Sequence, residues 1–352
     1  MKKFMSFLLA AVMLLSLAAC GSDNTAAPAD PEVPAQAEAA EEAAAEAEEA
    51  PAEKADVKIA ALKGPTAFGM LHLMELADKD EAPDNYEFTL AGSPDELVGS
   101  IVKGELDIAA VPVNLASVLY NKTEGAVQML ALNTLGVICC VENGDSIHSV
   151  KDLAGKTVYS LGKGSTPEFI INYLLTKNGL DPEKDVDVQY KSEPAEAAAM
   201  LAQGKGSVAV LPQPFVTALM VKNPDIRIAL DFNEEWSNSG AEGSVTTGCL
   251  IVQKAFAEEN PEVIDRFLAA YEESVNYTNG DDTRAEAAKL AEGYGILPAP
   301  VAEKAIPHCY IVCILGDEMK AETEPFLQVL FDADPASAGG KMPGEDFYFN
   351  AK

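Results

Sequence analysis

Residues 57–66 read Val57-Lys58-Ile59-Ala60-Ala61-Leu62-Lys63-Gly64-Pro65-Thr66, and this stretch decides the fold class. The first six residues are mostly apolar, which is typical of a short strand buried on both faces. Glycine and proline then end the strand, and an apolar-periodic helix is predicted from there to Leu76. A strand that leads through a tight loop into a helix is the repeating unit of an α/β protein.

The same unit recurs along the chain. Further strands are predicted over Tyr86 to Leu90, Leu106 to Val111, Lys156 to Leu161, Val186 to Tyr190, Val208 to Leu211 and Gly248 to Gln253, with helices between most of them. This alternation predicts mainly parallel sheets flanked by helices. The alternation of strands and helices begins again after Asn143-Gly144, so we expect two similar lobes.

The last hundred residues are predicted to be mainly helical. Helices are expected over Pro261 to Tyr277, Thr283 to Gly293 and Pro300 to His308. A less regular, Gly- and Pro-rich tail follows from Pro335 to Lys352, and its Phe347, Tyr348 and Phe349 are candidates for docking on a lobe.

The N-terminus is typical of an export signal. A positive start, Met1-Lys2-Lys3, precedes an apolar segment from Phe4 to Leu17 that is too short to span a bilayer comfortably. Small residues then lead into Cys20, and Leu17-Ala18-Ala19-Cys20-Gly21 resembles the lipobox of bacterial lipoproteins. This resemblance implies removal of residues 1–19, acylation of Cys20 and attachment to the outer face of the cell membrane. The alternative is an ordinary secreted protein with a chance cysteine.

Residues 20–56 are predicted to form an anchor site and a disordered acidic tether. The stretch from Ala35 to Ala55 is a low-complexity mixture of Ala, Glu and Pro that cannot bury enough apolar surface to fold. A flexible chain of this length has an end-to-end distance of roughly 30–35 Å. Such a tether would let the folded body reach a partner in the same membrane.

Charge and cysteine content exclude several classes of function. The formal net charge is −31, and residues 57–352 contain 45 acidic and 22 basic residues, which argues against nucleic acid as a partner. Five cysteines remain besides Cys20, namely Cys139, Cys140, Cys249, Cys309 and Cys313. A chain of this size needs no disulfide framework, so we expect buried free thiols. The cysteines and the three histidines lack zinc-site spacing, and we predict no metal and no cofactor.

Candidate ligand contacts follow the carboxyl ends of the predicted strands, where open α/β sheets bind their ligands. The candidates are Lys63, Gly64, Pro65, Thr66, Ser93, Asn114, Asn133, Thr134, Gly164, Ser165, Thr166, Gln213 and Trp236. Gly164-Ser165-Thr166 precedes a helix and offers backbone N–H groups and hydroxyls, although a plain helix cap is the alternative. Ser93 is also expected to cap a helix with Glu96. Trp236 is either a stacking wall for a flat ligand or a core anchor.

Four motifs carry a family resemblance. They are Gly104-Glu105-Leu106-Asp107-Ile108-Ala109 with Pro112, Leu153-Ala154-Gly155-Lys156-Thr157-Val158, Gly164-Ser165-Thr166-Pro167, and Val210-Leu211-Pro212-Gln213-Pro214-Phe215. Their order resembles the type II periplasmic-binding-protein fold, in the branch of ABC-transporter solute-binding proteins for nitrate, taurine, sulfonates and the pyrimidine precursor of thiamine. Where this family often has Glu-Pro or Asp-Pro, this chain has Gln213-Pro214, which weakens any inference of a cationic ligand.

The resemblance implies a discontinuous first lobe, residues 57–141 plus 249–352, and a second lobe, residues 142–248. The chain would cross between them near Cys139 to Gly144 and return near Thr246 to Ile251. The resemblance also implies a ligand held between the lobes and delivery to the permease of an ABC importer.

The sequence therefore predicts an extracytoplasmic solute-binding lipoprotein that captures a small organic or anionic molecule. No nucleophile–base order, paired-carboxylate spacing or phosphate loop stands out, so we predict no catalytic residues and no enzyme activity. Two alternatives stay open: an enzyme of the same fold, similar to those of futalosine-pathway menaquinone biosynthesis, and a sensing lipoprotein that transports nothing.

Overall fold

The computed structural model describes residues 53–161, 163, 166–191, 194–202, 204 and 207–350. The predicted signal segment, Cys20 and the tether up to residue 52 lie outside this part of the chain, as do Gly164 and Ser165. From Glu53 onward the described residues belong to one compact unit. None of the described helices is both long and apolar enough to cross a membrane.

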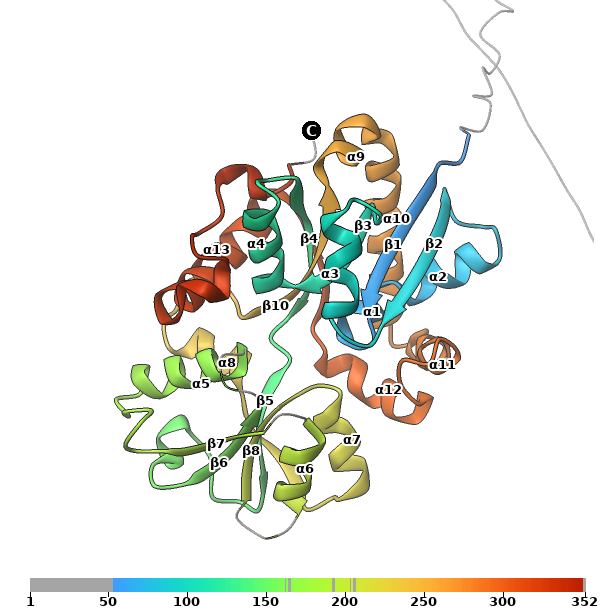
Figure 1. The fold of residues 1–352 in the computed structure, drawn as a ribbon. Helices are drawn as coiled ribbons and strands as arrows, with labels where there is room; N and C mark the ends of the chain where they lie inside the picture. The colour runs from blue at the N-terminus through green and yellow to red at the C-terminus, as the bar shows by residue number, and fades with distance from the viewer. Residues whose placement is uncertain are drawn as a thin grey trace, which may run out of the picture. The chain divides into compact units, whose positions relative to one another are not determined.

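The first of two sheets has six strands in the order β11-β4-β10-β3-β1-β2 (Figure 1). They are β1 (Asp56–Leu62), β2 (Asn85–Ala91), β3 (Ile108–Pro112), β4 (Val127–Leu135), β10 (Thr246–Gln253) and β11 (Ile311–Ile314). Strand β1 runs parallel to β2 and β3, whereas β10 runs antiparallel to β3 and β4. This sheet and the helices packed on it are called lobe 1.

The second sheet has five strands in the order β7-β6-β8-β5-β9. They are β5 (Ile138–Asn143), β6 (Thr157–Leu161), β7 (Asp187–Lys191), β8 (Ser207–Pro212) and β9 (Ile226–Asp231). Strand β6 is parallel to β7 and β8, and β5 is antiparallel to β8 and β9. This sheet and its helices are called lobe 2. Both sheets are mixed because each contains a strand, β10 or β5, that enters from the other lobe and runs against its neighbours.

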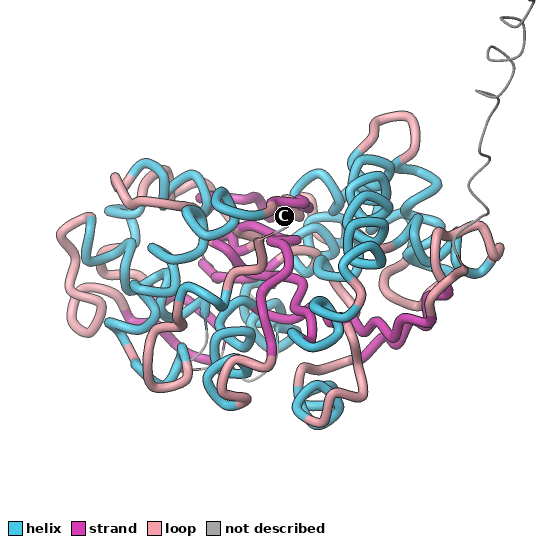
Figure 2. The backbone as a smooth tube through the Cα atoms, turned by 90° about the horizontal axis from the view of Figure 1, so that it is seen from above, coloured by secondary structure: helices cyan, strands magenta, loops and turns pink. Residues whose placement is uncertain are grey.

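Helices surround the strands of both sheets, as the view from above shows (Figure 2). They are α1 (Pro65–Phe68), α2 (Leu71–Asp78), α3 (Asp95–Val102), α4 (Val113–Lys122), α5 (Thr166–Lys177), α6 (Pro194–Ala202), α7 (Phe215–Lys222), α8 (Phe232–Asn238), α9 (Lys254–Glu259), α10 (Pro261–Asn279), α11 (Arg284–Gly293), α12 (Ala299–Ala305) and α13 (Gly316–Ala333). The predicted two-lobed α/β fold is confirmed. The single helix predicted from the Pro65 loop to Leu76 is instead two helices, α1 and α2.

The described chain passes between the sheets twice. It leaves lobe 1 after β4 and enters lobe 2 at β5, so that only Gly136 and Val137 connect the two strands. This passage comes earlier than the predicted stretch from Cys139 to Gly144, because Cys139 already pairs inside the second sheet. A Cβ on Gly136 would lie 2.9 Å from the Oδ1 atom of Asn233 and 3.1 Å from the Cβ of Val245. Because glycine has no side chain, the outgoing passage packs closely against α8 and against the segment that leads back into β10.

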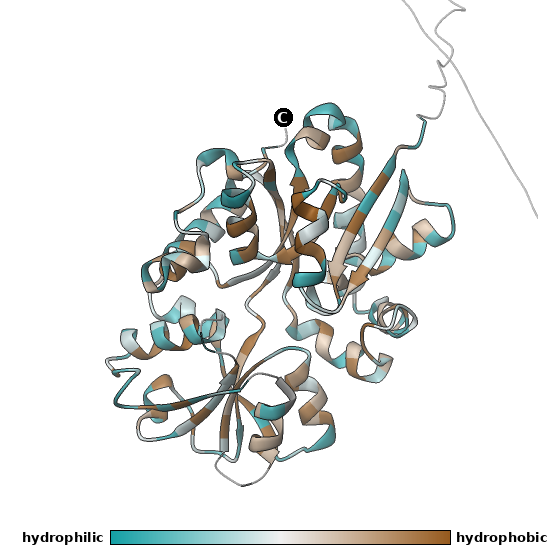
Figure 3. Cartoon of the chain, viewed as in Figure 1, coloured by the Kyte–Doolittle hydropathy of each residue, from teal (hydrophilic) through white to brown (hydrophobic). Residues whose placement is uncertain are grey.

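Helix α13, which the sequence analysis did not predict, packs on both lobes. Its Met319 and Leu327 belong to an apolar cluster with strands of lobe 1. Phe326 and Leu330 belong to the apolar core of lobe 2. The apolar strand segments at the centre of each sheet, drawn in brown, lie beneath helices whose outer faces are polar (Figure 3). One helix near the C-terminus thus joins two separate cores.

The C-terminal tail docks on lobe 1, as its aromatic residues suggested. Phe347 is fully buried and Tyr348 is nearly so. The Phe347 ring packs edge-on against Tyr120 of α4, with 5.2 Å between the ring centroids. The backbone N–H of Phe349 donates to the carbonyl oxygen of Met129 in β4, at 2.9 Å.

Replacing Phe347 by alanine should therefore destabilise the protein. Removing a fully buried phenylalanine costs roughly 3–5 kcal/mol through lost burial and the cavity left behind. Phe215→Ala is the matched control, since that side chain is 43% exposed and its loss should cost about 1 kcal/mol or less. Urea unfolding of both variants measures the two free energies. Equal stabilities would show that the tail does not support the fold.

Candidate functional site

A cavity of about 480 Å³ lies where the loops that follow β1 and β8 face one another across the two lobes. This volume lies within the usual range for small-molecule sites. Its lining residues are Lys63, Gly64, Pro65, Thr66, Thr134, Val137, Pro212, Gln213, Pro214, Phe215, Ala218, Thr247, Ile296 and Leu297. The cavity is thus at the carboxyl ends of the strands, where an open α/β sheet presents its binding loops.

Gln213 contributes a buried amide to the cavity wall. The residue directly follows β8, and its backbone N–H donates to the carbonyl oxygen of Val137 in the outgoing passage, at 2.8 Å. Its side chain is only 2% exposed. The hydrogen bond to Val137 holds this binding loop of lobe 2 against the connection between the lobes.

The orientation of the Gln213 amide is fixed by Thr217 on α7. The side-chain Oε1 atom accepts hydrogen bonds from the backbone N–H of Thr217, at 3.2 Å, and from its hydroxyl, at 2.8 Å. Because a backbone N–H can only donate, the atom facing Thr217 is the oxygen. The Nε2 group is therefore turned away from Thr217, and it is buried with no hydrogen-bond partner among the described residues.

Lobe 1 builds the opposite wall from the loop after β1. Gly64 has a φ of 151°, a conformation that favours glycine, and it sets the entry into the short helix α1. The Thr66 hydroxyl donates to the carbonyl oxygen of Leu62 at 3.2 Å. The backbone oxygen of Thr66 in turn accepts a hydrogen bond from the side-chain Nδ2 of Asn133, at 3.1 Å. Asn133 thereby fixes the loop to strand β4.

Close packing around Gly248 supports this wall from behind. Gly248 lies in β10, opposite Thr134 of β4. A Cβ atom at Gly248 would lie 2.6 Å from the Oδ1 of Asn133 and 2.7 Å from the Cγ2 of Thr66. No side chain fits at this position unless the loop after β1 moves.

The other hydroxyls of the cavity also donate to protein atoms. The Thr134 hydroxyl donates to the Oδ1 of Asn133 at 3.0 Å. The Thr247 hydroxyl donates to the backbone oxygen of Leu135. Among the described lining residues, Lys63 is exposed and charged. The prolines, Val137, Ile296, Leu297 and the half-exposed Phe215 supply apolar surface.

Six of the predicted contacts come together in this cavity, namely Lys63, Gly64, Pro65, Thr66, Thr134 and Gln213. Asn133 lies directly behind the wall. The residues that sequence reasoning missed are chiefly Thr247 and the pair Ile296-Leu297. Thr247 is next to Gly248 at the predicted return crossing, so its position in the sequence could have suggested it. The pair Ile296-Leu297 lies in a loop after α11, and no sequence pattern points to it.

The other predicted contacts that the structure describes do not line the cavity. Ser93 is on the surface, where its N–H and hydroxyl donate to the carboxylate of Glu96 at 2.9 and 3.1 Å. This is one half of the predicted capping box. The other half, a hydrogen bond from the helix backbone to the Ser93 side chain, does not form. Asn114 is half-buried in α4, and Thr166 starts α5. Gly164 and Ser165 lie outside the described residues.

Trp236 is a core residue of lobe 2. Its side chain has no exposed surface, and its ring stacks on Tyr173 with centroids 4.4 Å apart. Phe326 of α13 packs edge-on against it at 5.7 Å. Of the two alternatives for Trp236, the structure therefore supports the core anchor and not the stacking wall.

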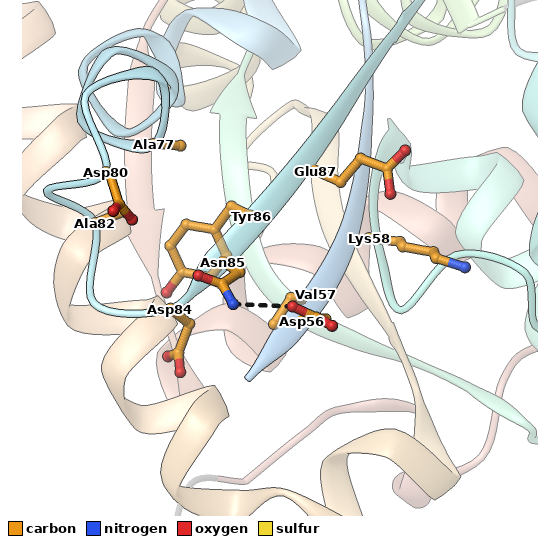
Figure 4. Close-up of a pocket in the computed structure, with 10 residues that line it drawn as sticks. All are labelled: Asp56, Val57, Lys58, Ala77, Asp80, Ala82, Asp84, Asn85, Tyr86 and Glu87. Atoms are coloured by element: carbon orange, nitrogen blue, oxygen red, sulfur yellow. Dashed lines mark hydrogen bonds between the residues drawn. The ribbon is translucent and has the colours of Figure 1, made fainter. Parts of the chain in front are cut away.

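A second hollow of about 430 Å³ lies at the amino ends of β1 and β2 (Figure 4). Two of its carboxylates are already engaged: the Asp84 carboxylate pairs with Arg266, at 2.6 and 2.9 Å, and Asp56 accepts from the side-chain amide of Asn85 at 2.9 Å. Binding loops of such sheets occur at the opposite strand ends.

A third hollow, of about 460 Å³, is formed within lobe 2 by α5 and β7, and Lys163 lines it.

A hydrogen bond links the lobes at the edge of the passages. The Tyr310 hydroxyl, just before β11 of lobe 1, donates to the Oδ2 of Asp231 at the end of β9 in lobe 2, at 2.7 Å. The other oxygen of Asp231 accepts from the backbone N–H of Asn233 and caps α8. Beside this link, burial raises the pKa of Cys139 to about 12, so its thiol stays protonated at neutral pH.

The cysteines of the described part form no disulfide and no metal cluster. Cys139, Cys140, Cys249 and Cys309 are buried free thiols, and Cys313 is partly buried. No group of three or more His, Cys, Asp or Glu residues suited to a metal ion occurs in the searched part of the chain.

Comparison with known proteins identifies relatives by sequence. The model of the NMT1-like family matches residues 87–292. A protein of Bacillus subtilis (strain 168) named "Putative binding protein YtlA" is 26% identical over 221 residues, which cover 61% of this chain and 63% of that protein. The match therefore spans less than two thirds of the length of this curated relative.

Solved structures share the fold over most of the chain. An ABC transporter protein from Parabacteroides distasonis has a TM-score of 0.70 and 23% identity, covering 84% of this chain and 99% of that one. The periplasmic aliphatic sulphonate binding protein SsuA from Escherichia coli has a TM-score of 0.67 and 17% identity, covering 84% and 92%. The nitrate-binding protein NrtA from Synechocystis PCC 6803 has a TM-score of 0.54 and 14% identity, covering 81% and 84%. The family match and these shared folds confirm the resemblance inferred from the sequence.

Gly248→Ala should disturb the cavity wall and lower stability by roughly 1–3 kcal/mol, as overpacking does in a well-packed core. Gly99→Ala in α3 is the matched control, because a Cβ there meets no atom within 4 Å. In a helix, this change should leave stability unchanged or raise it by about 0.5–1 kcal/mol. Urea unfolding compares the two. A Gly248→Ala protein as stable as the Gly99→Ala protein would contradict the close packing of Asn133 and Thr66 around Gly248.

Proposed function

We propose that this chain, which belongs to the NMT1-like family, is an extracytoplasmic solute-binding protein that captures a small molecule between its two lobes and delivers it to an ABC importer. The proposal extends the fold shared with binding proteins of such importers. On this proposal the partners are a small-molecule ligand and the permease subunits in the membrane.

One observation carries the proposal more than any other: a cavity of about 480 Å³ is lined by residues of both lobes, among them Thr66, Thr134 and Thr247 of lobe 1 and Gln213 of lobe 2. A molecule in this cavity would therefore contact both lobes at once. Thr217 fixes the side-chain amide of Gln213 through two hydrogen bonds, so this part of the wall is ordered before a ligand enters, which favours affinity.

Capture by closure of the lobes is supported by the small number of backbone connections between them. The outgoing passage contains two residues, Gly136 and Val137. Hinge motion is typically absorbed by a few residues of this kind. The Tyr310–Asp231 hydrogen bond and helix α13 lie across both lobes, so a change in lobe angle would alter these contacts. The two moving units would be those predicted from the sequence, with the outgoing hinge at Gly136–Val137.

Anchoring through Cys20 remains part of the proposal. The segment that ends at Ala19-Cys20-Gly21 supports it, together with the acidic stretch that follows. Two or three acyl chains give stable attachment, where one chain is marginal. A lipid-anchored body on a tether of this length could dock on a permease in the same membrane.

The alternative of an enzyme of the same fold is less well supported by the cavity. Among the described residues that line it, there is no histidine, cysteine or carboxylate. The three threonine hydroxyls donate to backbone or amide oxygens and have no adjacent base among these residues. Catalysis by general acid–base or nucleophilic chemistry needs such a group within hydrogen-bond reach. Binding without turnover is the function that this lining favours.

The purified protein should bind one small molecule from its own cells. Native mass spectrometry of the full chain should detect the molecule, and returning it to ligand-free protein should raise the melting temperature. Saturation at 100 times Kd corresponds to about 2.7 kcal/mol of stabilisation. Gln213→Leu should weaken binding at least tenfold, since it removes the amide that Thr217 holds in the cavity wall.

Gln189→Leu is the control for that substitution, because Gln189 is exposed on β7 and does not line the cavity. It should bind as the parent protein does. If no small molecule co-purifies, and extracts of the same cells do not shift the melting temperature, the import function is refuted.

Cys20→Ser should release the protein from the membrane. The parent protein should fractionate with membranes and incorporate labelled palmitate, because acylation needs the Cys20 thiol. The variant should lose the label and leave the membrane fraction, while Cys313→Ser should change neither. Labelling and membrane association that persist in Cys20→Ser would disprove the anchor.

A further inference from the structure

Tyr310 has a backbone conformation that is rare outside glycine. Its φ is 45°, in the left-handed region that disfavours residues with a side chain. Within the described part of the chain, the other non-glycine residues with positive φ are Asp80 and Glu124, and both are exposed in turns. Tyr310 is instead partly buried and lies directly before β11. Such a conformation persists only where surrounding contacts hold it.

The backbone of Tyr310 is fixed on lobe 1. Its carbonyl oxygen accepts a hydrogen bond from the backbone N–H of Leu135, the last residue of β4, at 3.1 Å. The preceding residue, Cys309, is fully buried in the apolar core of lobe 1, and the following residue, Ile311, pairs with β4. The backbone is therefore held at the point where the chain leaves lobe 1, one residue before Gly136.

The side chain of Tyr310 is fixed on lobe 2. Its hydroxyl donates to the Oδ2 of Asp231 at 2.7 Å. Asp231 ends β9 and is paired with Cys139 of β5, which lies two residues after Val137. The other carboxylate oxygen of Asp231 accepts from the backbone N–H of Asn233 at 2.8 Å, so lobe 2 itself orients the carboxylate.

This hydrogen bond is of the strong kind. An O–H group that donates to a carboxylate makes a shorter and stronger bond than one between two neutral groups. Burial, and after it the hydrogen bond to Asp231, raises the pKa of the Tyr310 hydroxyl, which therefore remains a donor at neutral pH. The bond thus stabilises any lobe arrangement that contains it.

The bond lies beside the outgoing passage and joins the same two ends. Gly136 and Val137 connect the lobes through the backbone, and Tyr310 connects them through its side chain. A rotation about the backbone of Gly136 or Val137 moves Asp231 relative to Tyr310. Because a hydrogen bond is lost when donor and acceptor are more than roughly 3.5 Å apart, a displacement of about 1 Å is enough to break it. The bond can therefore exist only within a narrow range of lobe angles.

The lobe arrangement that contains this bond is also the one that forms the cavity between the lobes. The lining has Thr66, Thr134 and Thr247 on lobe 1 and Gln213 on lobe 2, and a rotation of the lobes would change the spacing of these walls. Tyr310 and Asp231 are not among the described residues that line the cavity. Any effect of the pair on binding must then act through the lobe angle.

We propose that Tyr310 is a positioning residue for binding: its hydrogen bond to Asp231 stabilises the lobe arrangement in which both lobes line the cavity, and the bond breaks when the lobes rotate apart. This inference rests on the proposed function and adds the side-chain contact that sets the lobe angle. The two-residue passage supplies the freedom to rotate, and the Tyr310–Asp231 bond restricts it.

The distance between the lobes tests this role without a ligand. Spin labels are attached through p-acetylphenylalanine at Lys222 of α7 and Lys304 of α12, two exposed positions on lobe 2 and lobe 1, which leaves the native cysteines untouched. Double electron–electron resonance on the full chain, dialysed to remove bound small molecules, gives the distribution of separations. Tyr310→Phe should raise the share of a second separation about tenfold relative to that of the parent, since it removes a hydrogen bond to a charged group.

Tyr294→Phe is the matched control. The Tyr294 hydroxyl also donates to a carboxylate oxygen at 2.7 Å, but its acceptor is Asp78, and both residues belong to lobe 1. This variant loses the same kind of bond without loosening the lobes, so its distribution should match that of the parent protein.

Substitution of the acceptor provides a second, independent test. Asp231→Ser keeps a residue that caps α8 and removes the oxygen that accepts from Tyr310, so it should shift the distribution as Tyr310→Phe does. Asp231→Asn keeps the cap and can donate its amide to the Tyr310 oxygen, so it should restore most of the parent distribution. The double variant Tyr310→Phe with Asp231→Ser should shift no further than either single variant, because each removes the same bond.

Thermal unfolding shows which variants are folded, and the substitutions at Asp231 keep the test decisive if Tyr310→Phe is not. The positioning role is overturned if the folded variants at Tyr310 and Asp231 give the distribution of the parent, or if Tyr294→Phe shifts it as much. Either result would leave the binding function intact. Failure of any molecule to co-purify, with no stabilisation by cell extracts, would instead refute the binding function, so the two failures are distinguishable.

Discussion

Two short passages of backbone connect the lobes, and the geometry of the cavity depends on where they lie. Gly136 and Val137 carry the chain out of lobe 1, and the absence of a side chain at Gly136 lets this passage pack against Asn233 and Val245. Val137 then accepts the backbone hydrogen bond of Gln213 and itself lines the cavity. The connection between the lobes is therefore also part of the cavity lining, and on the proposed function ligand contact would be coupled to the angle between the lobes.

Two separate groups of hydrogen bonds order the walls of the cavity. In lobe 2, Thr217 fixes the amide of Gln213, and in lobe 1, Asn133 holds both the Thr66 backbone and the Thr134 hydroxyl. Proteins that share this fold are named for binding sulphonate or nitrate. The fold does not specify the ligand, because the binding groups are side chains of the loops, which differ between proteins of one fold.

Sequence reasoning predicted the two-lobed fold and six of the fourteen described residues that line the cavity, because both depend on local patterns. Strand–loop–helix units locate the loops after β1 and β8, and hence Lys63 to Thr66 and Gln213. Features set by tertiary contacts were missed. The run from Val127 to Val141 is mainly apolar, with Gln128, Asn133 and Thr134 as its polar residues, so the sequence reads as one strand and does not show that two strands meet at Gly136. Pro325 lies inside α13 and conceals the helix, since proline normally ends one. Trp236 gave no local indication of its place in the core, which depends on packing against α13.

A crystal structure of the protein with the molecule that co-purifies from its own cells tests the central claim most directly. The account predicts density for that molecule between the lobes, in contact with Gln213 of lobe 2 and with at least one of Thr66, Thr134 and Thr247 of lobe 1. A ligand found in the hollow at the amino ends of β1 and β2, or contacts to one lobe alone, would contradict it.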